Sequence, residues 1–244
     1  MRRIGYGLRQ FIDFILPPQN LLAYDEASQS GPHWQDIKFL DEPCCYACGF
    51  PFDYEAQTES LCAHCLASPP QYDRARAAFV YDDISRAFVL NFKHGGRTDK
   101  VEIFAAQMQR AGRRLLNDAN VIMPVPLHRS RLRQRRYNQA AILARRISQG
   151  TNIAFDPDSL LRKSPTPSQG GKSAAARRQN VKGAFTVAEK RREKIRHQNI
   201  ILVDDVMTTG ATLNACAKVL KRAGAARVDA ICLARVVHPL NLPK

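Results

Sequence analysis

The segment from Asn199 to Thr212 constrains the fold more than any other part of the chain. It reads Asn-Ile-Ile-Leu-Val-Asp-Asp-Val-Met-Thr-Thr-Gly-Ala-Thr. An uninterrupted apolar run of this kind is typical of a strand buried on both faces, as in a parallel sheet. Because acidic residues are costly inside such a strand, we expect Asp204 and Asp205 at its carboxyl end, where α/β folds bind ligands. A helix-forming segment follows, so a strand–loop–helix unit is predicted.

The loop after the acidic pair has the composition of an anion-binding site. Residues 208–212 read Thr-Thr-Gly-Ala-Thr and supply hydroxyls and a turn whose main-chain amides can converge on an anion. The carboxylates accept hydrogen bonds, whereas the loop donates them. A ligand that matches both carries neighbouring hydroxyls and a phosphate, which describes a ribose 5-phosphate. A structural alternative stays open, in which the strand ends in an acidic turn and Thr209 caps the next helix.

Strand-like and helix-like segments alternate along the rest of the second part of the chain. Apolar patterning predicts strands at 77–81, 121–126 and 228–236, and helices at 84–94, 101–116 and 137–148. Such alternation predicts an α/β fold with a mostly parallel sheet and helices on both of its sides.

Two C-x-x-C pairs lie in the amino-terminal part, separated by 13 residues. In a reducing compartment such pairs form a zinc site more often than disulfides. Four thiolates complete a tetrahedral shell and leave no open position for water, so the predicted role of the zinc is structural. The predicted ligands are Cys45, Cys48, Cys62 and Cys65, with Cys44 and His64 as lesser candidates.

Charge is distributed unevenly along the chain, whose net charge is +15. Residues 1–70 hold 4 Lys and Arg against 9 Asp and Glu, whereas residues 71–244 hold 33 against 13. Together with a Ser-Pro-Pro sequence at 68–70, this predicts an amino-terminal segment with a zinc-ribbon-like module over 1–70 and a second domain over 71–244. The excess positive charge suggests a polyanionic partner such as nucleic acid, although a basic soluble surface stays an alternative.

The sequence offers no apolar run that approaches the length needed to cross a bilayer. Near the amino terminus, Arg9 and Asp13 interrupt the apolar stretch and no small-residue cleavage site follows, which argues against a signal peptide. We therefore expect a cytoplasmic protein without a membrane span.

The segment 199–212 resembles the phosphoribosyl-pyrophosphate (PRPP) signature of the type I phosphoribosyltransferases. In that family the acidic pair binds the ribose 2′- and 3′-hydroxyls, and the following loop wraps the 5′-phosphate. The resemblance implies that Asp204 and Asp205 hold the ribose and belong to the catalytic centre, and that Mg²⁺ accompanies PRPP. It also implies that the phosphate loop consists of Met207, Thr208, Thr209, Gly210, Ala211 and Thr212.

Further motifs occur in order along the chain. They are Pro-Val-Pro-Leu-His at 124–128, Arg-Leu-Arg at 131–133, Arg-Tyr-Asn-Gln-Ala at 136–140 and Gly-Ala-Phe at 183–185. Together with the cysteine pairs, they resemble the ComF-like proteins, competence-associated relatives of the type I phosphoribosyltransferases with a cysteine-rich amino terminus. The resemblance spans roughly residues 36–238 and implies a phosphoribosyltransferase fold and a role in DNA uptake or utilisation.

The same resemblance implies a pyrophosphate loop after Pro126 and a flexible hood over 163–178 that closes on PRPP and excludes water. An arginine run is commonly a solvated face, and a Ser/Pro/Gly tract is commonly only a loop, so these alternatives stay open. The implied residues are His128, Arg129, Arg131 and Arg133 in the loop, and Gln169 and Arg177 in the hood.

Three functions follow as expectations. The first is PRPP binding with phosphoribosyl transfer, in which a nucleophile displaces pyrophosphate. The second is a non-catalytic sensor of PRPP or a nucleotide that also binds single-stranded DNA, with bases stacking on Tyr72, Tyr137 or Phe185. The third is an adaptor whose zinc module docks a helicase or another DNA-uptake protein. The sequence does not identify an acceptor for the ribosyl group.

Overall fold

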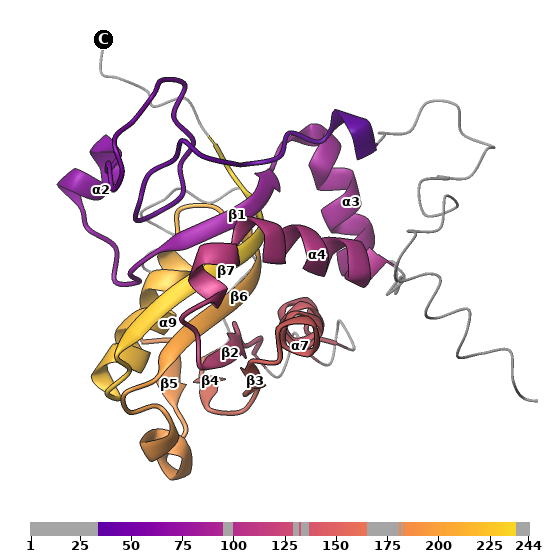
Figure 1. The fold of residues 1–244 in the computed structure, drawn as a ribbon. Helices are drawn as coiled ribbons and strands as arrows, with labels where there is room; N and C mark the ends of the chain where they lie inside the picture. Colours follow the sequence, from indigo (N-terminus) through magenta and orange to yellow (C-terminus); the bar gives the residue numbers. More distant parts are fainter. Residues whose placement is uncertain are drawn as a thin grey trace, which may run out of the picture.

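A five-stranded parallel sheet forms the centre of the molecule (Figure 1). The computed structural model describes residues 34–94, 100–128, 132, 137–164, 181 and 183–237. The strands are β1 (Ala75–Val80), β2 (Val121–Pro124), β3 (Ala154–Phe155), β6 (Asn199–Met207) and β7 (Arg227–Arg235). Their order is β1-β7-β6-β2-β3, and each pairing between neighbours is parallel. The predicted α/β fold with a mostly parallel sheet is confirmed.

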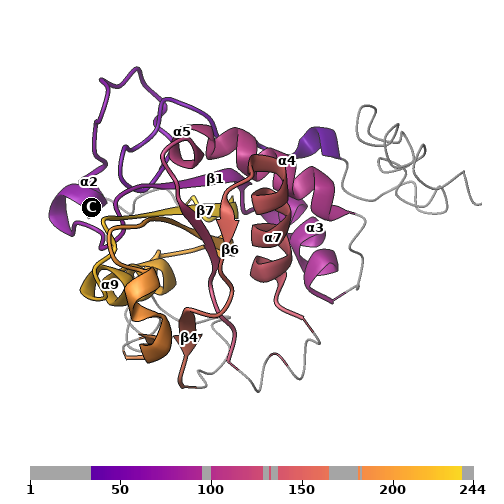
Figure 2. The same cartoon turned by 60° about the horizontal axis from the view of Figure 1, so that its bottom comes forward.

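Helices cover both faces of this sheet (Figures 1 and 2). One face carries α3 (Asp83–His94), α4 (Val101–Ala111) and α7 (Gln139–Thr151), and the other carries α9 (Ala211–Arg222). Shorter helices are α2 (Ala63–Ala67), α5 (Arg113–Leu116), and the 3₁₀ turns η2 (Trp34–Asp36) and η4 (Glu189–Lys194). None of the described helices is long and apolar enough to span a membrane.

Strand β6 is buried on both faces, which explains its uninterrupted apolar run. Ile200 and Leu202 belong to the core shared with α9, whereas Ile201 and Val203 belong to the core shared with α3, α4 and α7. Successive side chains on a strand point to opposite faces, so a strand between two cores needs apolar residues at every position. The strand predicted from this run is therefore confirmed.

The chain reverses its direction across the sheet between β2 and β6. From β2 it continues outward to β3, whereas from β6 it continues to β7 on the opposite side. Strand β2 ends at Pro124, which pairs with Val203, while β6 runs on to Met207. Such a switch point opens a crevice at the carboxyl ends of the two strands, where open α/β sheets bind ligands.

The amino-terminal segment covers the outer edge of β1. Main-chain hydrogen bonds join Leu40 N to Ala78 O at 2.9 Å and Ala75 N to Ala47 O at 2.7 Å. The approach is closest at Gly49, where φ is +67° and a Cβ would lie 2.5 Å from the Ala75 carbonyl oxygen. Only glycine fits there, so the edge strand is paired by the cysteine-rich segment rather than left open.

Several element bounds differ from those predicted. The helix expected over 101–116 is two helices, because the chain turns at Gly112, where a Cβ would lie 2.2 Å from Ile231 Cδ1. A two-stranded antiparallel sheet of β4 (Leu160–Arg162) and β5 (Phe185–Val187) lies outside the main sheet. Neither β3 nor β5 was predicted, since strands of two or three residues carry too little periodic signal.

Candidate functional site

The acidic pair lies in the carboxyl-terminal part of β6. Asp204 and Asp205 are each half-buried. Each carboxylate accepts a hydrogen bond from the next main-chain amide, Asp205 N to Asp204 Oδ1 at 2.9 Å and Val206 N to Asp205 Oδ1 at 2.6 Å. These local bonds hold both carboxylates close to the switch point beside β2, at the position predicted from the sequence.

The loop after β6 delivers the amino terminus of α9 to the same place. Gly210 has φ +71° and is the N-cap of α9, with no side chain capping the helix. Capping by Thr209, the structural alternative, is therefore wrong; its Oγ1 is buried and has no hydrogen-bond partner among the described residues. The first amides of a helix lack intrahelical acceptors and carry partial positive charge, so this turn suits an anion.

Two side chains support the loop from below. A Cβ placed on Gly210 would lie 3.2 Å from Met207 Cε and 3.2 Å from Tyr72 Oη. Met207 and Tyr72 are both buried, at 4% exposure each. The loop therefore rests on Met207 from its own strand and on Tyr72 from the segment that follows the cysteine pairs.

The exit of β2 is fixed beside β6 by the Tyr-Asn-Gln motif. Val125 N donates to Val203 O at 2.8 Å. Asn138 donates from Nδ2 to Val125 O at 3.1 Å, and its Oδ1 caps α7 by accepting from Ala140 N at 3.1 Å. His128 lies half-buried three residues further along this exit. Arg129, Arg131 and Arg133 lie outside the described residues, so the pyrophosphate loop stays a prediction.

Strands β4 and β5, which precede and follow the predicted hood, pair with each other. Arg162 of β4 pairs with Phe185 of β5, and Lys163 N donates to Ala184 O at 2.8 Å. The Arg162 guanidinium also lies over the Phe185 ring, 5.2 Å from its centroid. Lys163 and Ala184 are therefore neighbours, whereas Gln169 and Arg177 lie outside the described residues, so the hood stays a prediction.

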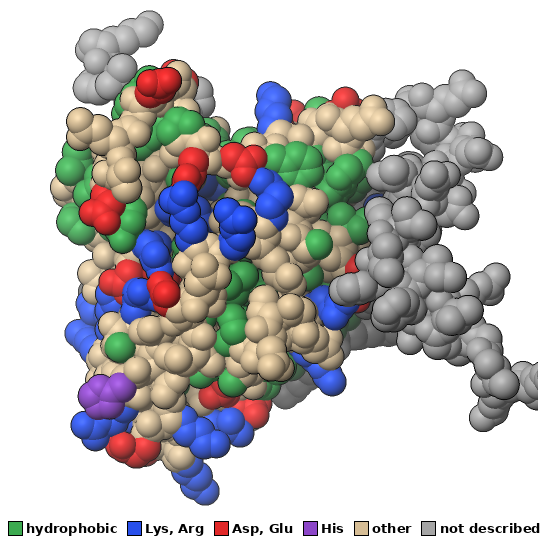
Figure 3. Space-filling model, viewed as in Figure 1, with side chains coloured by type: hydrophobic (Ala, Val, Ile, Leu, Met, Phe, Trp, Pro, Cys, Tyr) green, Lys and Arg blue, Asp and Glu red, His purple; other side chains and the backbone are tan. Residues whose placement is uncertain are grey.

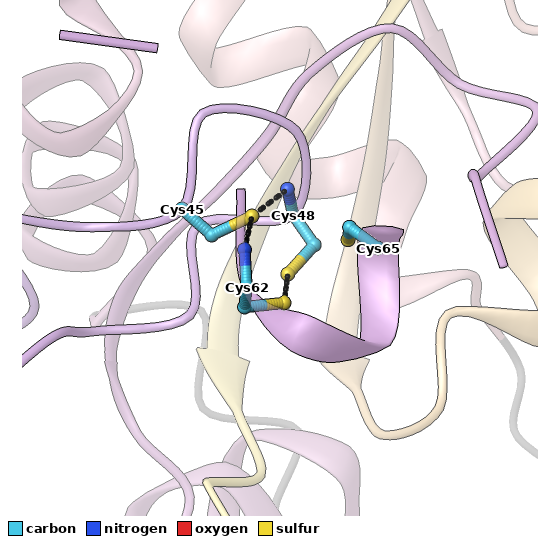
Figure 4. A group of neighbouring side chains, drawn as sticks. All are labelled: Cys45, Cys48, Cys62 and Cys65. Atoms are coloured by element: carbon cyan, nitrogen blue, oxygen red, sulfur yellow. Dashed lines mark hydrogen bonds between the residues drawn. The ribbon is translucent and has the colours of Figure 1, made fainter. Parts of the chain in front are cut away.

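The two C-x-x-C pairs converge on a single point (Figure 4). The ligand sulfur atoms of Cys45, Cys48, Cys62 and Cys65 all lie within 4.8 Å of one another, and all four residues are buried. Cys48 Sγ and Cys62 Sγ are 3.7 Å apart. Tetrahedral zinc with Zn–S bonds of about 2.3 Å places its sulfurs about 3.8 Å apart, so the arrangement fits this metal.

Main-chain amides donate hydrogen bonds to one of these sulfurs. Cys45 Sγ accepts from Cys62 N at 3.3 Å and from Cys48 N at 3.5 Å. Hydrogen bonds from the Cys48 and Cys65 side chains, together with these amides, lower the pKa of the Cys45 thiol. A lowered pKa favours the thiolate at Cys45, whereas the side-chain hydrogen bonds with Cys45 raise the pKa of the Cys48 and Cys65 thiols. The lesser candidates Cys44 and His64 are not part of this group.

Arg235 is a residue of this region that sequence reasoning missed. It ends β7, is 7% exposed, and donates to the main-chain oxygen and, at 3.5 Å, to the sulfur of Cys48. The sequence signal was an arginine directly after the apolar run Ala-Ile-Cys-Leu-Ala at 230–234. Its partner lies 187 residues away, so no local pattern could identify it.

The residues expected to stack on DNA bases are placed differently. Tyr72 and Phe185 are each only 4% exposed, so the prediction that DNA bases stack on either side chain is wrong. Tyr137 is half-buried and donates its hydroxyl to Phe92 O at 3.0 Å. All three aromatic side chains thus have packing roles within the described fold.

A separate cavity of about 340 Å³ opens between the amino-terminal segment, β1 and the α4–α5 turn. Four arginines line it, but two of them already form ion pairs, Arg110 with Asp41 and Arg114 with Glu42. The switch-point residues are not among those that line it, so this cavity is distinct from the candidate site.

Comparisons with known proteins agree with this geometry. The family model of the phosphoribosyl transferase domain matches residues 139–242. Competence protein F of Haemophilus influenzae is 33% identical over 198 residues, 79% of this chain and 85% of that protein. DNA utilization protein YhgH of Escherichia coli K12 is 26% identical over 81% of this chain and 86% of its own length. Competence protein ComFC of Bacillus subtilis is 25% identical over 91% and 87%. The chain therefore belongs to the ComF family of competence-related proteins and carries a phosphoribosyltransferase-type domain.

Proposed function

We propose that this chain binds PRPP at the carboxyl end of β6 and acts as a phosphoribosyltransferase-like protein of DNA uptake or utilisation. One observation carries the proposal: an acidic pair and a helix amino terminus lie together at the switch point of a parallel sheet. Either feature alone occurs in many folds. Their combination at the position where such sheets bind ligands matches a sugar phosphate.

Each part of the ligand has a matching group. Asp204 and Asp205 accept hydrogen bonds from the ribose 2′- and 3′-hydroxyls. The 5′-phosphate accepts hydrogen bonds from the first amides of α9 and from Thr209 Oγ1, which is buried without a partner in the described part of the chain. The first turn of α9 carries no acidic side chain that would repel the phosphate.

The acidic pair also suits a transfer reaction. The bond from ribose C1 to the pyrophosphate oxygen breaks, pyrophosphate leaves with the electron pair, and a nucleophile bonds to C1. Positive charge develops on the sugar ring, and the nearby carboxylates stabilise it. Mg²⁺ would neutralise charge on the pyrophosphate oxygens, and it would keep several of its waters because it dehydrates reluctantly.

Other parts of the chain complete the proposal. Zinc in the four-cysteine site is structural, because four thiolates leave it no open position. The exit of β2, with His128 and the arginines at 129, 131 and 133, binds pyrophosphate, and the tract with Gln169 and Arg177 covers it. The division into 1–70 and 71–244 and the cytoplasmic location also belong to the proposal. Relatives named for competence and DNA utilisation support the biological role.

Calorimetry with PRPP and Mg²⁺ tests the binding. The Asp204→Asn, Asp205→Asn double variant should lose affinity by at least tenfold, since hydrogen bonds to charged groups contribute about 1.5–3 kcal/mol. The matched control is Asp53→Asn, Asp158→Asn, which removes the same charge from two exposed positions. Equal affinities in the two double variants would refute the site.

Catalysis and sensing are separated by a second assay. Purified protein is incubated with PRPP, Mg²⁺ and a panel of bases and amines, and pyrophosphate is measured. Release that depends on one acceptor identifies an enzyme. Binding without release for the whole panel favours a sensor. Titration with single-stranded DNA at several salt concentrations tests the DNA interpretation, because contacts to phosphates weaken steeply as salt rises.

A docking function is the second candidate, and exposed apolar side chains favour it. Leu66 is 66% exposed and Tyr54 is 59% exposed, both in the cysteine-rich segment. Figure 3 shows hydrophobic side chains at the surface around α2. Replacing both by serine should reduce DNA uptake in cells while zinc content and PRPP affinity stay unchanged. Normal uptake by this variant would remove the candidate.

A further inference from the structure

Arg235 occupies a buried position between the four-cysteine site and the phosphate loop. Its guanidinium donates to Cys48 O and to Cys48 Sγ, the latter at 3.5 Å. Nη1 also lies 3.7 Å from the Met207 sulfur, and the guanidinium stacks over the Phe50 ring at 5.4 Å. One side chain therefore contacts a metal-ligating cysteine on one side and the last residue of β6 on the other.

The charge of Arg235 suits a metal-bound cluster. Four thiolates around Zn²⁺ carry a net charge of −2, and a buried excess charge is costly unless a counter-ion or hydrogen bonds compensate it. Arg235 is 7% exposed, so it too needs a buried partner of opposite charge. Hydrogen bonds from outer residues to ligating sulfurs also fix the ligands and tune metal affinity. Cluster and guanidinium thus stabilise each other.

Met207, which Arg235 contacts, in turn contacts the loop that the proposed function assigns to phosphate binding. Arg235 and Met207 are paired neighbours on β7 and β6, and Val236 N donates to Met207 O at 2.9 Å. Met207 Cε lies directly under Gly210, 3.2 Å from where a Cβ would be. A shift of the guanidinium therefore moves Met207, on which the N-cap of α9 rests.

We propose that Arg235 is a positioning residue that couples the metal site to the sugar-phosphate site, so that bound zinc and bound PRPP strengthen each other. The inference rests on the proposed function, because zinc can change PRPP affinity only if the loop at 207–212 binds PRPP. Coupling between two ligands is reciprocal: PRPP must raise zinc affinity by the same factor by which zinc raises PRPP affinity.

The chain offers a matched control for Arg235. Arg76 also anchors the first cysteine pair, since its Nη1 donates to Tyr46 O at 3.0 Å and Ala75 O at 2.9 Å. Arg76 is on β1, and its described hydrogen bonds all go to main-chain oxygens rather than to a sulfur atom or to Met207. Arg76→Met therefore removes comparable hydrogen bonds to the cysteine-rich segment and leaves the contact between Arg235 and Met207 in place.

The experiment measures both affinities in each variant. Zinc affinity is obtained by competition with a chromogenic chelator, and PRPP affinity by calorimetry with Mg²⁺ on zinc-saturated protein, after circular dichroism has confirmed folding. Arg235→Met should lose about tenfold in both affinities, in the range of outer-residue effects on metal sites. Arg235→Lys keeps the positive charge but lacks the planar guanidinium, so its two affinities should lie between those of Arg235→Met and the unsubstituted protein. Arg76→Met should leave PRPP affinity unchanged.

Zinc removal from the unsubstituted protein gives the complementary result. We expect PRPP affinity to fall by about the factor by which PRPP raises zinc affinity. If PRPP binds equally well with and without zinc, and Arg235→Met binds it as tightly as Arg76→Met, the coupling is refuted while the proposed function stands. If the zinc-loaded protein does not bind PRPP at all, the proposed function fails, and the coupling fails with it.

Discussion

The two ends of the central sheet use aspartate in opposite ways. At the amino end, Asp229 is 1% exposed and is paired by two arginines: Arg74 Nη2 lies 2.6 Å from Oδ2, and Arg227 Nε lies 3.2 Å from it. At the carboxyl end, Asp204 and Asp205 stay half-buried and accept main-chain amides beside a helix amino terminus. The first arrangement fixes strands, whereas the second leaves carboxylate oxygens near a place where a ligand fits.

This difference teaches how to separate structural from functional acids in one sheet. All three aspartates lie in apolar strands and look alike in the sequence. Burial and partners distinguish them, because a fully buried carboxylate must be neutralised by neighbouring groups of the protein. A half-buried carboxylate at a switch point can exchange water for ligand hydroxyls. Substitutions at the two ends should therefore affect different measurements.

The largest effect on stability should come from the amino end. Asp229→Asn removes the buried charge that pairs with Arg74 and Arg227, so the free energy of unfolding should fall by about 3–5 kcal/mol. Urea denaturation measures this loss. Asp118→Asn is the control, because Asp118 is 53% exposed and contacts the same arginines; exposed pairs contribute about 0–1 kcal/mol. A fall in PRPP affinity of the folded Asp229→Asn protein would contradict a purely structural role for Asp229.

Gly210→Ala should damage the carboxyl end through both backbone and contacts. The left-handed φ of +71° costs a residue with a Cβ about 1–2 kcal/mol, and this Cβ would also press on Met207 and Tyr72. We expect lower stability together with weaker PRPP binding, measured by thermal unfolding and calorimetry. Gly183→Ala has the same strain, at φ +70°, but its Cβ meets no atom of the described residues within 4 Å. Equal losses of PRPP affinity in the two variants would contradict the assigned role of the loop.

Thr209→Val sharpens the comparison without disturbing the fold. Valine keeps the shape of threonine and removes a buried hydroxyl that lacks a partner in the described structure. Stability should stay the same or rise slightly, while PRPP affinity should fall by about tenfold, as expected for a lost hydrogen bond to a charged group. Thr212→Val, at the half-exposed second residue of α9, provides a comparison within the same loop. A Thr209→Val protein with unchanged affinity would exclude this hydroxyl from the site.

The smallest effect concerns two thiols between the ends. Burial, and then the charge of Asp204, raises the pKa of both Cys216 and Cys232. A raised pKa leaves less thiolate at any given pH, so neither residue should react with iodoacetamide in the folded protein at about pH 8. Mass spectrometry of peptides from native and urea-treated samples measures the labelling. Rapid labelling of either thiol in the native sample would show that this layer of the sheet opens.

Local patterns in the sequence were sufficient for the central strand and for the cluster of four cysteines. The apolar run before Asp204 predicted a strand between two cores, and the spacing of the cysteines predicted their convergence. Both signals are short-range: one comes from residue type at consecutive positions, the other from two pairs that each close a single turn.

Long-range contacts could not be predicted in the same way. Arg74 and Asp229 are 155 residues apart, and Arg235 and Cys48 are 187 apart, so their pairing depends on the completed sheet. The need for glycine at position 112, between α4 and α5, comes from a close approach to Ile231 of β7. Buried positions of Tyr72 and Phe185 likewise follow from tertiary packing, which is why their predicted role in stacking was wrong.

The most direct test of the central claim compares two sugar phosphates that differ by one hydroxyl. Calorimetry compares ribose 5-phosphate with 2-deoxyribose 5-phosphate on the unsubstituted protein and on the Asp204→Asn, Asp205→Asn variant. If the acidic pair holds the ribose hydroxyls, the unsubstituted protein should prefer ribose 5-phosphate by about tenfold or more, and the variant should lose this preference. Equal affinity for the two sugars in the unsubstituted protein, or a preference that survives in the variant, would contradict the account.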